Sequence, residues 1–141
     1  MSGDWSIRAG RRDDVEAVLE LWRAAESVST PTDSREALLV LLAHDPEALV
    51  VAEAGGALVG SLIVAWDGWR ASFHRLAVAP GHRRRGLATE LVRRGEERLH
   101  SRGAIRLTAV VARDEPAAFT LWEALGYVWQ PGHLRFTRDL G

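Results

Sequence analysis

The chain of 141 residues contains no cysteine and no lysine, and it has one methionine and one tyrosine. The absence of cysteine excludes a disulfide framework, a thiolate nucleophile and a cysteine-ligated metal. The absence of lysine means that all 18 basic residues are arginines, and they are balanced by 19 acidic residues. The resulting net charge of −1 argues against general nucleic-acid binding, which requires a basic surface.

Long apolar runs are also absent, since no segment reaches the ~20 residues that a membrane-spanning helix needs. The beginning of the sequence, around Asp4 and Trp5, lacks the apolar core of a signal peptide, so we expect a cytoplasmic protein without a membrane partner. The five histidines are scattered and no H-E-x-x-H pattern occurs, so we expect no metal site. The ordinary composition predicts that residues 1–141 form a single domain.

Apolar periodicity and turn signals predict an α/β protein with a mixed sheet. Asp33 and Glu36 resemble a capping box at the start of a helix. Gly55-Gly56 and Asp67-Gly68 are typical of hairpin turns. The order β-α-α-β-β-β-α-β-α-β-β gives about seven strands and four helices. The predicted strands are 5–9, 48–54, 57–66, 69–78, 104–111, 127–130 and 133–137, and the helices begin near residues 13, 33, 85 and 114.

One segment combines the end of a strand, a turn and the start of a helix with positive charge. The apolar run 76–79 ends at Pro80 and Gly81, and the sequence His-Arg-Arg-Arg-Gly-Leu-Ala-Thr follows over 82–89. A helix N-terminus presents unpaired N–H groups and the positive end of the helix dipole, so it suits a phosphate. Gly86 permits close approach of the backbone to a ligand. The alternative is a solvated arginine run without a ligand.

The pattern Arg83-x-x-Gly86-x-Ala88 resembles the Q/R-x-x-G-x-G/A signature of the GNAT superfamily of N-acetyltransferases. Residues 118–127 resemble a second motif of that family, A-x-x-L-Y-e-k-l-G-F. The resemblance covers essentially the whole chain and implies the GNAT fold, with acetyl-CoA as cosubstrate and no metal. It implies acetyl transfer to a primary amine of a small molecule or peptide. Attack would be direct, in a ternary complex, because no cysteine can carry the acetyl group.

The resemblance also implies which residues hold acetyl-CoA. In the family, the strand before the signature carries a bulge and separates from the next strand, and pantetheine lies between them. The N–H groups of residues 85–89 would hold the pyrophosphate, and the Val78 N–H region would polarise the acetyl carbonyl. The predicted cofactor-binding residues are Leu76, Ala77, Val78, Arg83, Arg84, Arg85, Gly86, Leu87, Ala88, Thr89, Glu115 and Trp122.

The catalytic prediction rests on His74 together with Val78. His74 stands where a relative carries a catalytic histidine, and it could relay the proton of the amine. The alternative is a hydrogen-bonded structural histidine. Two residues depart from the family pattern: Trp122 replaces a tyrosine that protonates the thiolate, and Glu115 replaces an asparagine. These departures keep two rivals open, a catalytically weak acyl-CoA-binding module and an interaction domain, and a homodimer stays open as well.

Overall fold

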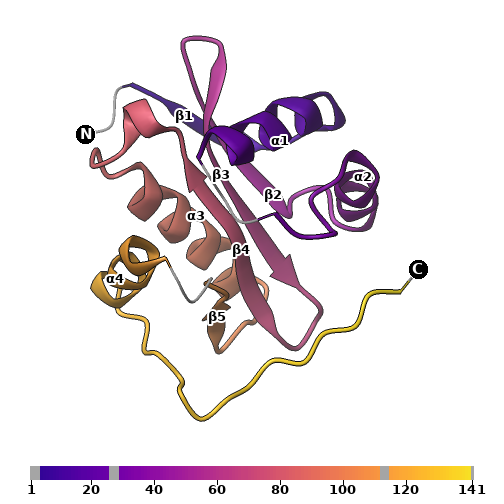
Figure 1. Cartoon of the computed structure of the whole chain (residues 1–141), viewed down its shortest axis with the longest axis vertical. Coiled ribbons are helices and arrows are strands. Elements are labelled where there is room, and N and C mark those ends of the chain that lie inside the picture. Colours follow the sequence, from indigo (N-terminus) through magenta and orange to yellow (C-terminus); the bar gives the residue numbers. More distant parts are fainter. Residues whose placement is uncertain (1–3, 26–28, 112–114, 141) are drawn as a thin grey trace. The chain divides into compact units, whose positions relative to one another are not determined.

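The structure is a computed structural model, and it describes residues 4–25, 29–111 and 115–140. The chain divides into two units, residues 1–110 and residues 111–141. The first unit is built around a five-stranded sheet, and the second contains helix α4 (Pro116–Ala124) (Figure 1). Within the described ranges, no helix combines the length and the apolar character that crossing a membrane requires.

The sheet of the first unit is mixed, with the strand order β1-β2-β3-β4-β5. Strands β1 to β4 are antiparallel to their neighbours, whereas β5 runs parallel to β4. The strands are β1 (Ser6–Ala9), β2 (Leu49–Ala54), β3 (Ala57–Trp66), β4 (Ala71–Val78) and β5 (Leu107–Ala109), and the helices are α1 (Val15–Ala24), α2 (Arg35–His44) and α3 (Leu87–Ser101), with short 3-10 turns η1 (Arg12–Asp14) and η2 (Pro80–His82).

Helices α1 and α2 cover one face of this sheet. Both present apolar stripes at helical spacing, and these stripes form a common core with strand residues of that face. Strand β4 contributes to both faces: Ala77 belongs to the core with α1 and α2, whereas Phe73 packs against Gly95 of α3. The buried members of this core are Val15, Val18, Leu21, Trp22, Leu38, Leu42, Leu49, Val51 and Ala77.

Helix α3 lies on the opposite face, close to β3 and β4, because two glycines permit the approach. A Cβ atom on Gly60 would lie 3.0 Å from the Leu87 side chain, and one on Gly95 would lie 2.7 Å from Phe73. Buried leucines of α3 fill the space between the helix and the sheet, and Leu91 is fully buried. The close packing fixes the N-terminus of α3 directly after the turn that leaves β4.

The prediction of a mixed α/β fold is confirmed, and that of seven strands is wrong. Residues 127–130 and 133–137 form no strand, and the predicted strand 104–111 shortens to Leu107–Ala109. The C-terminal apolar side chains are exposed, for example Val128 at 77% and Phe136 at 91%. A two-stranded hairpin is marginal in water on its own, and with its apolar side chains exposed this segment gains little from pairing.

The predicted capping box at Asp33 is also wrong. Ser34 is the N-cap of α2, and its hydroxyl accepts the Ala37 N–H at 3.1 Å. Asp33 instead binds Arg75 of β4 through an ion pair. Both residues are good N-caps, so the tertiary contact decided between them.

Candidate functional site

The loop that joins β4 to α3 contains two residues in the left-handed conformation. Arg84 has a φ of 63°, and Gly86, the N-cap of α3, has a φ of 85°. Glu90 N–H donates to the Gly86 carbonyl at 3.1 Å and begins the helical bonding. The N–H groups of Leu87, Ala88 and Thr89 precede that bond, so the helix itself supplies no acceptor for them. This end of α3 can therefore bind an anion.

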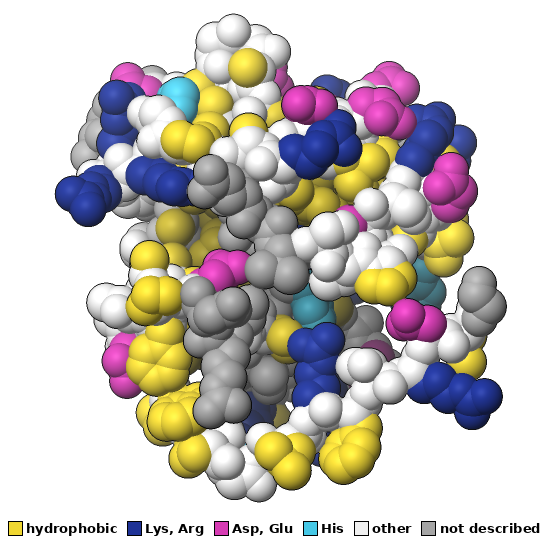
Figure 2. All heavy atoms as spheres, in the orientation of Figure 1, with side chains coloured by type: hydrophobic (Ala, Val, Ile, Leu, Met, Phe, Trp, Pro, Cys, Tyr) yellow, Lys and Arg dark blue, Asp and Glu magenta, His cyan; other side chains and the backbone are white. Residues whose placement is uncertain are grey.

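The surface at the loop is open. Residues 83–86 are exposed, and a Cβ atom on Gly86 would meet no described atom within 4 Å. Leu87 is 1% exposed, so its side chain belongs to the core and only its backbone faces the loop. Arginine side chains gather on this side of the molecule (Figure 2). The open space, the aligned N–H groups and the positive charge suit a phosphate.

Arg83 is held by backbone carbonyls from two directions. Its Nε donates to the Val78 carbonyl at 3.3 Å, and its Nη2 donates to the Ala25 carbonyl at 3.2 Å. The guanidinium therefore connects the end of β4 with the end of α1. Arg85 lies 3.8 Å from the Asp4 carboxylate, with both side chains largely exposed. The predicted phosphate contacts of the arginines thus stay a proposal, while the bridging contacts of Arg83 stabilise the loop.

Strand β4 carries a bulge just before the loop. Ser61 pairs with Ala77 and Ile63 pairs with His74, so Arg75 and Leu76 together face a single residue of β3. Arg75 has a φ of 55°, which is rare for a residue other than glycine. The bulge overlaps the predicted cofactor-binding segment 76–78 at Leu76.

Two backbone N–H groups at and after the bulge point away from groups of β3 that bond their neighbours. The Arg75 carbonyl accepts the Ser61 hydroxyl of β3 at 3.0 Å, and in a trans peptide the following N–H, of Leu76, points the opposite way. Ala79 N–H donates to the Val59 carbonyl at 2.8 Å. Bonding alternates along an antiparallel ladder, so the preceding residue, Val78, which pairs with Gly60, turns its N–H away from β3.

Strand β5 follows β4 for only part of its length. Ala71–Phe73 pair with Leu107–Ala109, and Val110 N–H donates to the Phe73 carbonyl at 3.3 Å. Among the described residues, β5 has no pairing partner in β4 beyond that point. The Leu76 and Val78 N–H groups thus lie beyond the part of β4 that pairs with β5. The sequence predicted the Val78 N–H region as the group that polarises the acetyl carbonyl. The direction of the Leu76 N–H follows from the bulge, which the sequence did not reveal.

His74 lies on the α1–α2 face of β4, two residues after Ser72. The Ser72 Oγ and the His74 Nε2 are 2.8 Å apart, a hydrogen bond whose direction depends on the tautomer of the ring. Both side chains are partly buried. The histidine is thus a hydrogen-bonded residue whose geometry also permits it to pass a proton.

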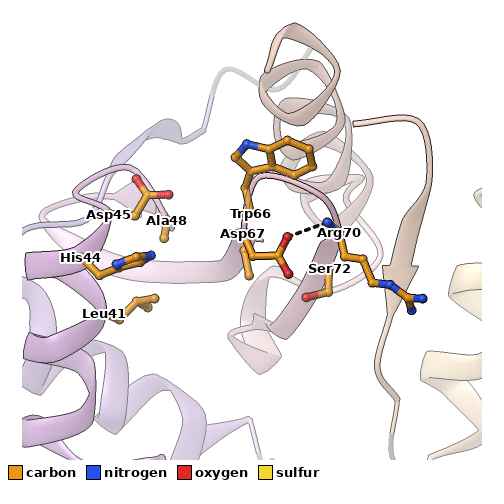
Figure 3. Close-up of a pocket in the computed structure, with 9 residues that line it drawn as sticks. Leu41, His44, Asp45, Ala48, Trp66, Asp67, Arg70 and Ser72 are labelled. Carbon is orange, nitrogen blue, oxygen red and sulfur yellow. Dashed lines mark hydrogen bonds between the residues drawn. The ribbon is translucent and has the colours of Figure 1, made fainter. Parts of the chain in front are cut away.

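A cavity of about 240 Å³ lies beside Ser72, between the end of α2 and the β3–β4 hairpin. His44 points from α2 toward Trp66 and the hairpin (Figure 3). The hairpin carboxylate, Asp67, accepts the N–H groups of Arg70 and Trp69 at 2.6 and 2.7 Å, and these bonds lower its pKa. The cavity therefore combines an aromatic wall with polar groups next to the Ser72–His74 pair.

Asp45 also lines this cavity. Burial acts to raise the pKa of Asp45, but the Glu47 N–H and the Arg98 guanidinium outweigh it and lower the pKa overall. Arg98 binds both carboxylate oxygens, at 2.9 and 3.0 Å.

Glu115 and Trp122 belong to the second unit, and the structure places them relative to α4 only. Glu115 is the N-cap of α4 and makes no side-chain capping bond within the described residues. The Trp122 ring stacks edge to face on Tyr127, with centroids 4.9 Å apart. Among the residues that the structure describes, no group of three or more His, Asp or Glu side chains could hold a metal ion.

The sequence and the fold are both similar to those of acetyltransferases. Acetyltransferase SG1711 of Sodalis glossinidius is 36% identical over 134 residues, which cover 95% of this chain and 94% of that protein. Ard1 from Thermoplasma volcanium shares the fold with a TM-score of 0.79 at 20% identity, over 89% of this chain and 83% of that one. The PaiA N-acetyltransferase from Thermoplasma acidophilum was solved in complex with coenzyme A. It gives a TM-score of 0.72 at 17% identity, with 85% of this chain and 87% of that chain covered.

The sequence profile of the acetyltransferase (GNAT) family matches residues 15–127, which include the β4–α3 loop, the bulged strand and α4. With this match and the close relatives, the chain belongs to the acetyltransferase (GNAT) family and is an acetyltransferase.

Proposed function

We propose that the chain transfers an acetyl group from acetyl-CoA to a primary amine of a small molecule or peptide, by direct attack in a ternary complex. The observation that carries the proposal is the β4–α3 loop, where the left-handed Gly86 exposes the first N–H groups of α3. The open space over Gly86 fits a pyrophosphate. The coenzyme A in the complex of the PaiA neighbour supports the same cosubstrate.

Acetyl-CoA supplies an activated thioester carbonyl, and the chain supplies the polar groups around it. The N–H groups of Leu76 and Val78 would stabilise the negative charge that develops on the carbonyl oxygen. His74 would accept the amine proton, directly or through water, and Ser72 would orient its ring. Trp122 has no acidic proton to give, so the departing thiolate would take its proton from solvent.

The cavity beside Ser72 is the proposed entrance for the acceptor. It lies on the same face of β4 as His74, and the Ser72 hydroxyl connects the two. We also propose that residues 1–141 act as one catalytic domain, and the family match across both units supports this.

Calorimetric titration with acetyl-CoA tests the proposal, on the wild type and on the double variant Arg83→Ala/Gly86→Glu. We expect binding that the variant abolishes, because a carboxylate in the loop repels phosphate. A release assay for the CoA thiol, run with a panel of amines, then tests transfer. Binding without release for any amine would favour the acyl-CoA-binding module, and absence of binding would favour the interaction domain.

A further inference from the structure

Four side chains behind the bulge of β4 form one connected network. Ser61 is fully buried, and its Oγ accepts the Trp22 indole N–H at 2.9 Å while donating to the Arg75 carbonyl at 3.0 Å. The Arg75 guanidinium pairs with Asp33, with Nε 3.0 Å from Oδ1, and lies 5.2 Å from the centroid of the Trp22 ring. Both the backbone and the side chain of Arg75 are therefore held.

The network determines the direction of one peptide group. The Ser61 hydroxyl has a single proton. Because its oxygen already accepts the Trp22 indole N–H, it donates that proton to the Arg75 carbonyl. The left-handed conformation of Arg75 is unfavourable by itself and persists only where surrounding contacts determine it. The ion pair with Asp33 is such a contact. It is largely shielded from water, because the Arg75 side chain is 16% exposed and the Asp33 side chain is 12% exposed.

We infer that Ser61, Trp22 and Asp33 are positioning residues that fix the Arg75–Leu76 peptide, so that the Leu76 N–H faces the thioester carbonyl of the bound acyl donor. The inference rests on the proposed function, because it concerns the carbonyl of acetyl-CoA. None of the three touches the reacting atoms in this assignment. They act through Arg75, whose carbonyl and side chain they bind.

The carbonyl stretch of bound acetyl-CoA reports this contact directly. Difference infrared spectroscopy with acetyl-CoA labelled with ¹³C at the carbonyl would show a lower frequency on binding to the wild type, because a hydrogen bond polarises the carbonyl. Ser61→Ala removes the bond to Arg75, and we expect it to lose most of that lowering. We also expect its affinity for acetyl-CoA, relative to CoA, to fall about 2–10-fold, the range for one neutral hydrogen bond.

Two further variants keep the test decisive if Ser61→Ala does not fold. Trp22→Phe removes the indole N–H while keeping an aromatic ring, and Asp33→Asn removes the charge of the ion pair while keeping the shape of the side chain. The matched control is Asp14→Asn. Asp14 also binds an arginine, Arg8, through both oxygens, and its side chain is 13% exposed against 12% for Asp33, but it lies beside β1. A purely structural role would affect both aspartate variants alike.

The outcomes separate the inference from the proposed function. A reduced carbonyl shift in Ser61→Ala or Asp33→Asn, with a wild-type shift in Asp14→Asn, supports the inference. A wild-type shift in every variant that binds acetyl-CoA, or an equal loss in Asp14→Asn, overturns it. A wild type that binds acetyl-CoA without a shift overturns the inference alone, and a wild type that does not bind overturns both.

Discussion

Replacing Gly86 by alanine tests whether the loop before α3 binds the acyl donor, and Gly103 provides the matched control. The two glycines flank α3 at its opposite ends, with φ angles of 85° and 106°. A Cβ atom at either position would meet no described atom within 4 Å. The two substitutions therefore impose the same kind of backbone strain, without a clash inside the protein.

The expected cost in stability is similar for both variants. Alanine in the left-handed region costs about 1–2 kcal/mol. The reduced freedom of the unfolded chain offsets about 0.4–1 kcal/mol of this. A net loss of about 1 kcal/mol lowers Tm by roughly 4 °C for a chain of this size. Thermal unfolding followed by circular dichroism measures the shift.

The two variants should differ in ligand binding. At Gly86 the added methyl group enters the space above the first N–H groups of α3, so we expect the Kd for acetyl-CoA to rise at least ~10-fold, or about 1.4 kcal/mol. At Gly103 we expect a change within about twofold. Calorimetric titration gives both values. Equal affinities in Gly86→Ala and Gly103→Ala would refute the assignment of the loop as the phosphate site.

Three further predictions concern His74, Asp14 and Gly95. His74→Ala should lower turnover at saturating amine about 100-fold or more, with unchanged binding of acetyl-CoA, and unchanged turnover would remove His74 from the mechanism. The Arg8 guanidinium holds the pKa of Asp14 below its usual value, so the pair stabilises the fold above about pH 4 and this contribution disappears as the pH falls further; Asp14→Asn should flatten the acid limb of a plot of Tm against pH, and parallel plots would contradict this. Gly95→Ala should lower stability despite a gain in helix propensity of about 1 kcal/mol, because its Cβ would lie 2.7 Å from the Phe73 ring; a raised Tm would show that α3 can move away.

The elements with strong local signals were predicted within a few residues. β2 and β3 are apolar runs joined by a Gly-Gly turn, and both glycines adopt positive φ as that turn requires. Gly86 was expected in the loop because a phosphate site needs open backbone, and its position as the N-cap of α3 fits that expectation. These features depend on neighbours along the chain, which the sequence displays.

The remaining features depend on partners far away in the sequence. Asp33 and Ser34 are equally good caps, and Arg75, which lies 42 residues further on, engages Asp33. Ser61 is one small residue in an apolar strand, and its bond to Arg75 exists only in the bulged register. The direction of the Leu76 N–H follows from that register. The C-terminal segment carries a turn signal, but a turn signal alone does not determine whether the residues on either side pair as strands.

The ion pairs of the described residues have a chemical property that matters for an enzyme handling an acylating agent. Each of them has an arginine as its cation, including those that hold Asp14, Asp33 and Asp45. A lysine in these places could lose its charge to acetylation, whereas a guanidinium stays protonated and is a poor nucleophile. The contacts that stabilise the fold and the bulge are therefore inert toward the donor that the site is proposed to bind.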